Sequence, residues 1–138
     1  MESIRIVKLN YSHFAACVEF SVWGANKNIL TRWKDGDYVI FKTESEVLGV
    51  AVVNGDPFTS EDVLWESDLY PYRIPVKFIH IVGKKDLEKV TSDVRSELIR
   101  AFGFSYGFYI LRQHPLPTET ANNILRIILS SSNDLSSS

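Results

Sequence analysis

The clearest structural signal in the sequence is YVIFKTESEVLGVAVVN, at residues 38–54. Two runs rich in β-branched and aromatic residues, 38–42 and 47–54, flank the polar segment TESE at 43–46. Because β-branched and aromatic residues fit a pleated, half-buried surface and polar residues favour turns, the stretch predicts a β-hairpin. Gly49 lies inside the second strand and predicts a bulge or the close approach of another backbone.

Outward from this hairpin, hydrophobic spacing predicts further strands and helices. A strand at 72–82 has apolar residues on both faces, which predicts a central position in a sheet. The other predicted elements are a strand at 4–9, a short helix ending near 20, an extended piece at 21–25, a helical turn at 28–33, a polar loop at 56–71, a helix at 86–100 broken near Thr91, an extended aromatic segment at 104–111 and a final helix after 117. Together they predict an α+β domain over residues 1–130, in which helices flank a curved mixed β-sheet or partial barrel. Residues 131–138 predict a flexible Ser-rich tail or linker.

Length, charge and cysteine content narrow the class of protein. The 138 residues suffice for one domain with one sizeable core. A net charge of -2 and a pI of about 5.9 argue against strong nonspecific nucleic-acid binding, which rests on neutralising phosphates, but they permit a protein that buries one base. The only cysteine, Cys17, excludes an internal disulfide and a Cys-rich zinc site, and we expect it to be a small buried hydrophobe. The sequence has no signal-peptide pattern and no apolar run of membrane-spanning length, so we expect a cytoplasmic protein that does not bind membranes.

Catalytic chemistry has little support in the sequence. The three histidines, His13, His80 and His114, are isolated, with no metal-ligand spacing between them, and His80 is expected to be structural. The sequence carries no nucleophile triad, glycine-rich phosphate loop or paired-carboxylate motif. We therefore expect no enzyme activity, no catalytic residue, no metal and no cofactor.

Two of the three tryptophans lie in polar, loop-like contexts. Trp23 is followed by Gly-Ala-Asn, and Trp65 is followed by Glu-Ser-Asp, whereas Trp33 follows Leu-Thr-Arg and is expected to be a core residue. A tryptophan at the end of a strand or in a loop favours a pocket wall. Paired aromatic rings suit a flat ligand such as a nucleobase, because every base has a π-face on which a ring can stack.

The order of four segments resembles a YTH or EVE domain of the PUA-like superfamily. The segments are RIVKLN at 5–10, SVWGANKN at 21–28, the hairpin strands at 38–41 and 48–51, and the pair Leu64-Trp65 with YPYRIPV at 70–76. Arg112 with Pro-Leu-Pro at 115–117 matches EVE proteins in particular. The resemblance extends to about Leu129. The sequence is also similar to the N-terminal modified-DNA-recognition domains of McrBC-type restriction systems.

The resemblance implies an aromatic cage around N6-methyladenine. In that cage Trp23, Trp65 and Tyr70 are walls, the backbone carbonyl of Gly24 accepts the N6–H, and Asn10 contacts the base edge. The segment after the first strand is one residue shorter than in YTH relatives, so other side chains can share the base-edge role. The further candidates for the base edge are Tyr11, Ser12, His13, Asn26 and Asn28, and those for phosphate contacts are Lys27, Arg32, Lys34, Arg73 and Arg112.

The function that follows from the resemblance is a noncatalytic module that flips a modified base, N6-methyladenine in DNA, into the cage. Such a module would be the specificity domain of a modification-dependent restriction system. Its partners would be modified nucleic acid, with DNA favoured over RNA, and a nucleotide-hydrolysing restriction subunit, either fused to the chain or assembled with it. The sequence does not decide between N6-methyladenine and another modified base such as 5-methylcytosine. It also leaves open a reader of modified RNA, and a domain that binds or processes a nucleotide or another small molecule.

Overall fold

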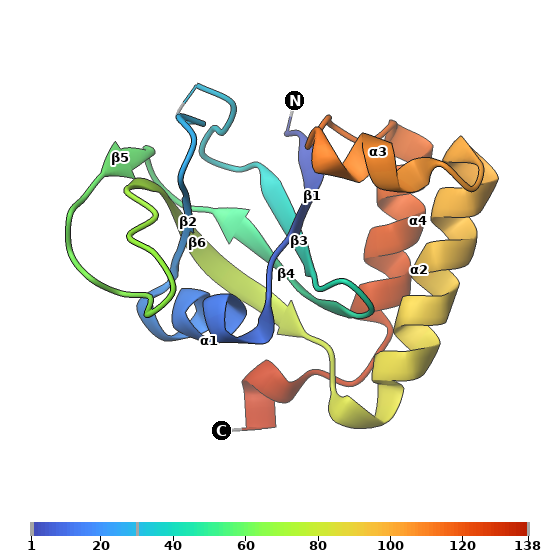
Figure 1. The fold of residues 1–138 in the computed structure, drawn as a ribbon. Coiled ribbons are helices and arrows are strands. Elements are labelled where there is room, and N and C mark those ends of the chain that lie inside the picture. The colour runs from blue at the N-terminus through green and yellow to red at the C-terminus, as the bar shows by residue number, and fades with distance from the viewer. Residues whose placement is uncertain (1, 30, 138) are drawn as a thin grey trace.

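The structure, a computed structural model, describes residues 2–29 and 31–137 as a curled mixed sheet with helices on either side (Figure 1). Along the chain the elements are β1 (Ile4–Lys8), α1 (Tyr11–Phe20), β2 (Val22–Ala25), β3 (Tyr38–Lys42), β4 (Val47–Val53), β5 (Phe58–Thr59), β6 (Tyr72–Ile81), the 3-10 turn η1 (Lys84–Asp86), α2 (Leu87–Phe102), α3 (Tyr106–Leu111), α4 (Thr118–Leu129) and the 3-10 turn η2 (Asp134–Ser137). The α+β class and the curved mixed sheet predicted from the sequence are confirmed.

The long strand β6 joins the two parts of the sheet. The strand order is β1-β3-β4-β6-β2, with β5 also paired to β6. Only the β1–β3 pair is parallel among the described strands. The first half of β6 pairs with β2, up to Pro75, and the second half pairs with β4, from Val76 onward. Because one strand changes partner along its length, the sheet curls, and the central position predicted for this strand is confirmed.

Gly49 is the place where β4 and β6 approach most closely. A Cβ atom on Gly49 would lie 2.5 Å from the carbonyl oxygen of His80, a distance that only glycine allows. The register between the two strands shifts between Val50 and Ala51, which marks a bulge. Both features follow the sequence prediction for this glycine.

Alternating side chains of the sheet contribute to two apolar cores. In β3, Val39 and Phe41 point to the core shared with α1, and Ile40 points to the core shared with α2 and α4. Figure 1 shows α2, α3 and α4 together at one side of the sheet, with α1 at the other. Cys17 is fully buried in the first core, as expected, and Trp33 lies there too. The core on the α1 side therefore holds the three tryptophans around which the candidate site is built.

Two local predictions are wrong, and a third falls partly outside the described residues. The segment predicted as extended at 104–111 contains helix α3, in which Ile110 is buried and the ring of Tyr109 stacks on Phe102 at a centroid distance of 4.1 Å. Helix α2 continues through Thr91, because the Thr91 hydroxyl accepts a hydrogen bond from the backbone N–H of Val47 and so is used by the sheet. In the region 28–33 the backbone N–H of Arg32 closes a tight turn onto the carbonyl of Ile29, and Leu30 lies outside the described residues.

The Ser-rich C-terminal segment differs from the flexible tail predicted for it. Asn133 bridges to Val82, and its side-chain oxygen accepts from the backbone N–H of Ile81 at 3.1 Å. His80, buried as expected, places Nε2 3.1 Å from the hydroxyl of Ser131. Ser131 and Asn133 therefore contact groups at the end of β6, whereas Ser138 lies outside the described residues.

Candidate nucleic-acid interface

A groove of about 960 Å³ opens beside the start of α1 and the end of β2. Four segments distant in sequence form its walls: the β1–α1 junction, β2 with the chain that follows it, the loop before β6, and the end of α3 with the residues after it. The residues that line it are Lys8, Leu9, Asn10, His13, Trp23, Gly24, Ala25, Asn26, Lys27, Asn28, Ile29, Arg32, Tyr70, Leu111, Arg112, Gln113 and His114. Most residues predicted from sequence for the site thus meet in one place.

The groove is basic, although the whole chain carries a net charge of -2. Its lining includes Lys8, Lys27, Arg32 and Arg112, and none of the described lining residues is acidic. Lys8 forms an ion pair with Glu44, just outside the groove. The other three cations project from exposed positions. Charge of one sign gathered in a concave site attracts polyanions, even on a protein that is acidic overall.

Trp23 and Trp65 are both buried, and they occupy different depths. Trp23 lines the groove and packs edge-on against Trp33, with ring centroids 5.3 Å apart. Trp65 lies behind the lining residues, where its indole Nε1–H donates to the backbone carbonyl of His13 at 3.1 Å. Tyr70 meets Trp65 edge to face at 5.3 Å and itself reaches the groove. Of the three predicted walls, Trp23 and Tyr70 therefore line the groove, and Trp65 lies behind it in contact with Tyr70.

His13 is seated among these aromatic rings. Its imidazole stacks on Tyr70 with centroids 4.2 Å apart and planes 28° apart, and it meets Trp65 edge-on at 5.2 Å. Burial lowers the pKa of His13 to about 4, and a hydrogen bond to the backbone of Gly24 opposes this shift only in part. Its Nε2 is buried without a hydrogen-bond partner. A flat, neutral, nitrogen-bearing ring therefore packs against two of the three aromatic residues predicted as cage walls.

Gly24 is the glycine on which the aromatic arrangement depends. A Cβ atom there would lie 2.6 Å from the ring of Trp65 and 2.9 Å from the Cβ of Tyr70. No L side chain fits without moving those rings, so the glycine sets how closely β2 approaches the loop before β6.

We expect Gly24→Ala to lower the free energy of unfolding by about 1–3 kcal/mol, because overpacking forces the Trp65 ring from its position. Gly107→Ala is the matched control, since a Cβ at that helical position meets no atom within 4 Å and alanine favours a helix over glycine. Urea unfolding followed by tryptophan fluorescence measures both. Equal stability of Gly24→Ala and the unaltered protein would show that the rings have more room than this geometry gives.

Arg73, predicted to contact phosphate, instead holds the loop that carries Trp65 and Tyr70. Its side chain is 1% exposed, and its guanidinium lies 5.2 Å from the centroid of the Trp65 ring. Its Nε donates to the carbonyl of Tyr70 and its Nη2 to the carbonyl of Leu69, both at 3.2 Å, and Nη2 also donates to the carbonyl of Asp62. A phosphate cannot reach a guanidinium so enclosed, so that prediction is wrong.

The remaining predicted residues divide by position. Asn10 lines the groove and also caps α1, where its side-chain oxygen accepts from the N–H of His13 at 2.7 Å. Asn26 lies at the rim and donates to Asp68 at 2.7 Å, which ties β2 to the Trp65 loop. Tyr11, Ser12 and Lys34 are exposed and lie outside the groove lining. Seven lining residues were not predicted as site residues, and only their position near predicted ones along the chain pointed to them: Lys8, Leu9, Ala25, Ile29, Leu111, Gln113 and His114.

Within residues 2–29 and 31–137, no group of three or more His, Cys, Asp or Glu side chains is placed to hold a metal ion. Among the helices described, none has the length and apolar character needed to cross a membrane.

The curled sheet, the flanking helices and their order define a domain with the YTH fold. No protein-family model and no curated protein matches the sequence, whereas solved structures match the fold. The YTH domain of Mmi1 is 18% identical, with a TM-score of 0.67 over 94% of this chain and 96% of that one. The Pho92 YTH domain in complex with m6A is 15% identical, with a TM-score of 0.63 over 92% and 83%. The YTH domain of Zygosaccharomyces rouxii MRB1, in complex with N6-methyladenosine RNA, is 14% identical, with a TM-score of 0.61 over 97% and 91%.

Proposed function

We propose that this chain is a noncatalytic module that binds nucleic acid through one modified base, N6-methyladenine, held in the groove. The observation that carries the proposal is the groove itself, in which a cluster of aromatic rings lies beneath a rim of Lys27, Arg32 and Arg112. Aromatic rings bind a base through its π-face, and the cations bind the phosphates on either side. The ligands of the Pho92 and MRB1 domains, which share the fold, support the choice of base.

A base enters this site by displacing the imidazole of His13. The imidazole lies 4.2 Å from Tyr70, the distance of a stacked ring, so base and imidazole cannot both stack on that face. Leaving its own stack costs a base a few kcal/mol, and stacking on an aromatic side chain returns roughly 1–3 kcal/mol. One buried methyl group adds about 0.8 kcal/mol. The backbone carbonyl of Gly24, released by His13, is then the acceptor for the N6–H of the base.

RNA and DNA are both consistent with the groove. The resemblance of the sequence to restriction-system modules favours DNA, whereas the ligand-bound domains that share the fold carry RNA or N6-methyladenosine. The preference for DNA therefore has no support beyond the sequence resemblance, and RNA is at least as good a candidate. Contact with the 2′-hydroxyl, which only RNA carries, is the chemical difference a protein can use.

We expect Tyr70→Ala to weaken binding of a methylated oligonucleotide about ten-fold or more, because the base loses a stacking surface. Fluorescence anisotropy at fixed salt would compare the same short single strand as RNA and DNA, each with N6-methyladenine, 5-methylcytosine or no modification. Tyr70 is suited to the test because it is only partly buried, whereas truncating the buried Trp23 would cost about 3–5 kcal/mol of stability.

Phe20→Ala is the control for this experiment, because it removes an exposed aromatic ring at the end of α1, away from the groove lining. Tight binding that depends on the N6-methyl group and on Tyr70, and not on Phe20, supports the proposal. Failure to bind any of the six oligonucleotides, or equal binding by Tyr70→Ala, would reject it. The ratio of RNA to DNA affinity assigns the polymer.

A further inference from the structure

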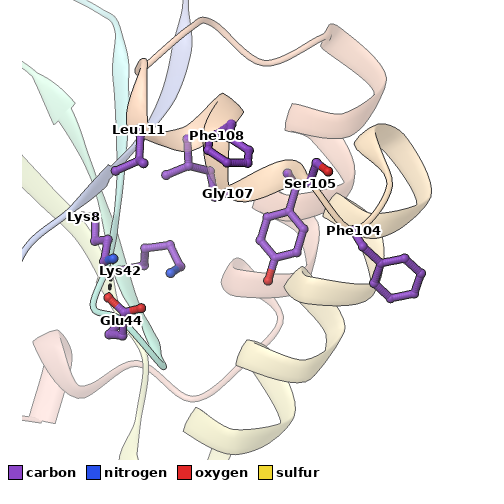
Figure 2. Close-up of a pocket in the computed structure, with 10 residues that line it drawn as sticks. Lys8, Lys42, Glu44, Phe104, Ser105, Gly107, Phe108 and Leu111 are labelled. Atoms are coloured by element: carbon purple, nitrogen blue, oxygen red, sulfur yellow. Dashed lines mark ion pairs between the residues drawn. The ribbon is translucent and has the colours of Figure 1, made fainter.

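A second hollow, of about 390 Å³, adjoins the groove on the side of α3. Figure 2 shows Lys8 and Lys42 from the sheet, with Glu44 from the β3–β4 turn, on one side of it. Ser105, Phe108 and Leu111, from α3 and the preceding loop, lie on the other side. Lys8 and Leu111 line both the hollow and the groove. The two depressions are therefore parts of one continuous surface.

Large apolar side chains are exposed on this surface. Phe104 is 88% exposed, Phe108 72% and Leu111 66%, and the three come from one short segment of the chain. Phe104 and Phe108 are four residues apart and are the two most exposed aromatic side chains among the described residues. Together with Leu111 they line one hollow, and an exposed apolar patch of this kind marks a site of contact.

Cations stand next to these rings. Lys8 and Lys42 line the hollow, and Arg95 lines a smaller depression together with Lys42 and Glu44. Partial burial, together with the nearby positive charge of Lys8 and Arg95, holds the pKa of Lys42 below its usual value, against the opposing effect of Glu44. Two lysines line the hollow against one carboxylate, Glu44, which pairs with Lys8, so the hollow carries a net positive charge, and Arg95 adds to it from the neighbouring depression. Exposed rings beside positive charge suit a single nucleic-acid strand better than an apolar protein surface.

We propose that the nucleotides adjoining the base in the groove lie across this hollow, with bases stacked on Phe104 and Phe108 and phosphate beside Lys8 and Lys42. This inference rests on the proposed function and extends it from one base to the neighbouring stretch of strand. The groove and the hollow share Lys8 and Leu111, so a strand that leaves the groove past Leu111 enters the hollow directly. Stacking on a phenylalanine does not select among bases, so this surface adds affinity without adding a sequence requirement.

The test compares two single-stranded ligands that carry one N6-methyladenosine, a trimer and a nonamer with the modified base at the centre. The variants are the double substitution Phe104→Ala with Phe108→Ala, and Phe58→Ala as the control, which removes an exposed ring on β5. We expect the double variant to bind the nonamer about ten-fold more weakly and the trimer equally well. We also expect Lys42→Met to reduce the salt dependence of nonamer binding by about 0.7 in the log–log slope, with no change for the trimer.

The outcomes separate this inference from the proposed function. If the unaltered protein binds the trimer, and the double variant binds the nonamer as tightly as the unaltered protein does, the inference is rejected and the groove stands alone. A double variant that keeps its nonamer affinity but changes the sedimentation behaviour of the chain would assign the surface to protein contact and likewise reject it. If neither ligand binds the unaltered protein, the proposed function fails, and this inference fails with it.

Discussion

Arg73→Met is expected to lower the free energy of unfolding by about 3 kcal/mol or more and to abolish binding of a methylated base. The buried guanidinium donates to three backbone carbonyls of the segment 62–70. A buried polar group that loses its partner costs about 1–3 kcal/mol, and methionine supplies no donor. Tyr70 adds to the effect because its backbone is in the left-handed region, at φ 47°, which is unfavourable for a residue other than glycine. Arg73 binds the carbonyl of that same residue and holds it there.

Binding fails in this variant because Trp65 and Tyr70 both belong to the segment that Arg73 holds. The measurement is urea unfolding together with oligonucleotide binding at a temperature where the variant is folded. Lys77→Met, an exposed position on the same strand, is the control and should change stability by less than about 0.5 kcal/mol. Arg73→Lys should rescue little, since an ammonium cannot reproduce the planar fork that reaches three carbonyls. Unfolding and binding close to those of the unaltered protein would show that the loop is held by other contacts.

Elements with a strong local pattern were predicted correctly from the sequence. The hairpin at 38–54 and the strand at 72–82 are apolar, β-branched and bounded by turn residues, so local preference and tertiary structure agree there. The segment at 104–111 is different, because its aromatic residues favour strands by propensity. Helix α3 buries Ile110 and leaves Phe108 and Leu111 exposed, a pattern that packing against α2 and β1 decides and local sequence does not.

The aromatic residues of the site could be predicted because their order and surroundings along the sequence match those of known domains. Trp23 with Gly24, and Trp65 with Tyr70, match a known pattern of segments, and the structure brings them together. The roles of Arg73 and His13 could not be predicted in the same way. The role of Arg73 depends on how the preceding loop folds, since its partners are carbonyls three to eleven residues earlier in the chain. The role of His13 depends on rings more than fifty residues away. An arginine in a strand gives no local sign that it faces backbone carbonyls.

Acidification is expected to destabilise the protein through His13, by about 3 kcal/mol between pH 7 and pH 4. The pKa of His13 is about 4 in the folded protein, against an ordinary value of 6.5. Below pH 6.5 the unfolded chain therefore takes up a proton that the folded chain does not, so the contribution of His13 to stability is complete above pH 6.5 and is lost as pH falls towards 4. Urea unfolding across this range should show the loss in the unaltered protein and in His114→Asn, which alters an exposed histidine. In His13→Asn the free energy of unfolding should not show this loss of about 3 kcal/mol between pH 7 and pH 4.

Protonation of His13 should strengthen base binding, although it destabilises the folded protein. When a base displaces His13, the imidazole leaves its site against Tyr70 and Trp65 and regains an ordinary pKa, so binding takes up a proton between pH 6.5 and 4. Affinity for a methylated oligonucleotide should then rise about ten-fold from pH 7.5 to pH 5.5, even as the protein becomes less stable. Of the other groups at the site, Cys17 has a pKa raised to about 12 by burial and does not titrate in this range. His13→Asn should remove the rise in affinity, whereas affinity that is flat with pH in the unaltered protein would mean that His13 stays in place and the base binds in front of it.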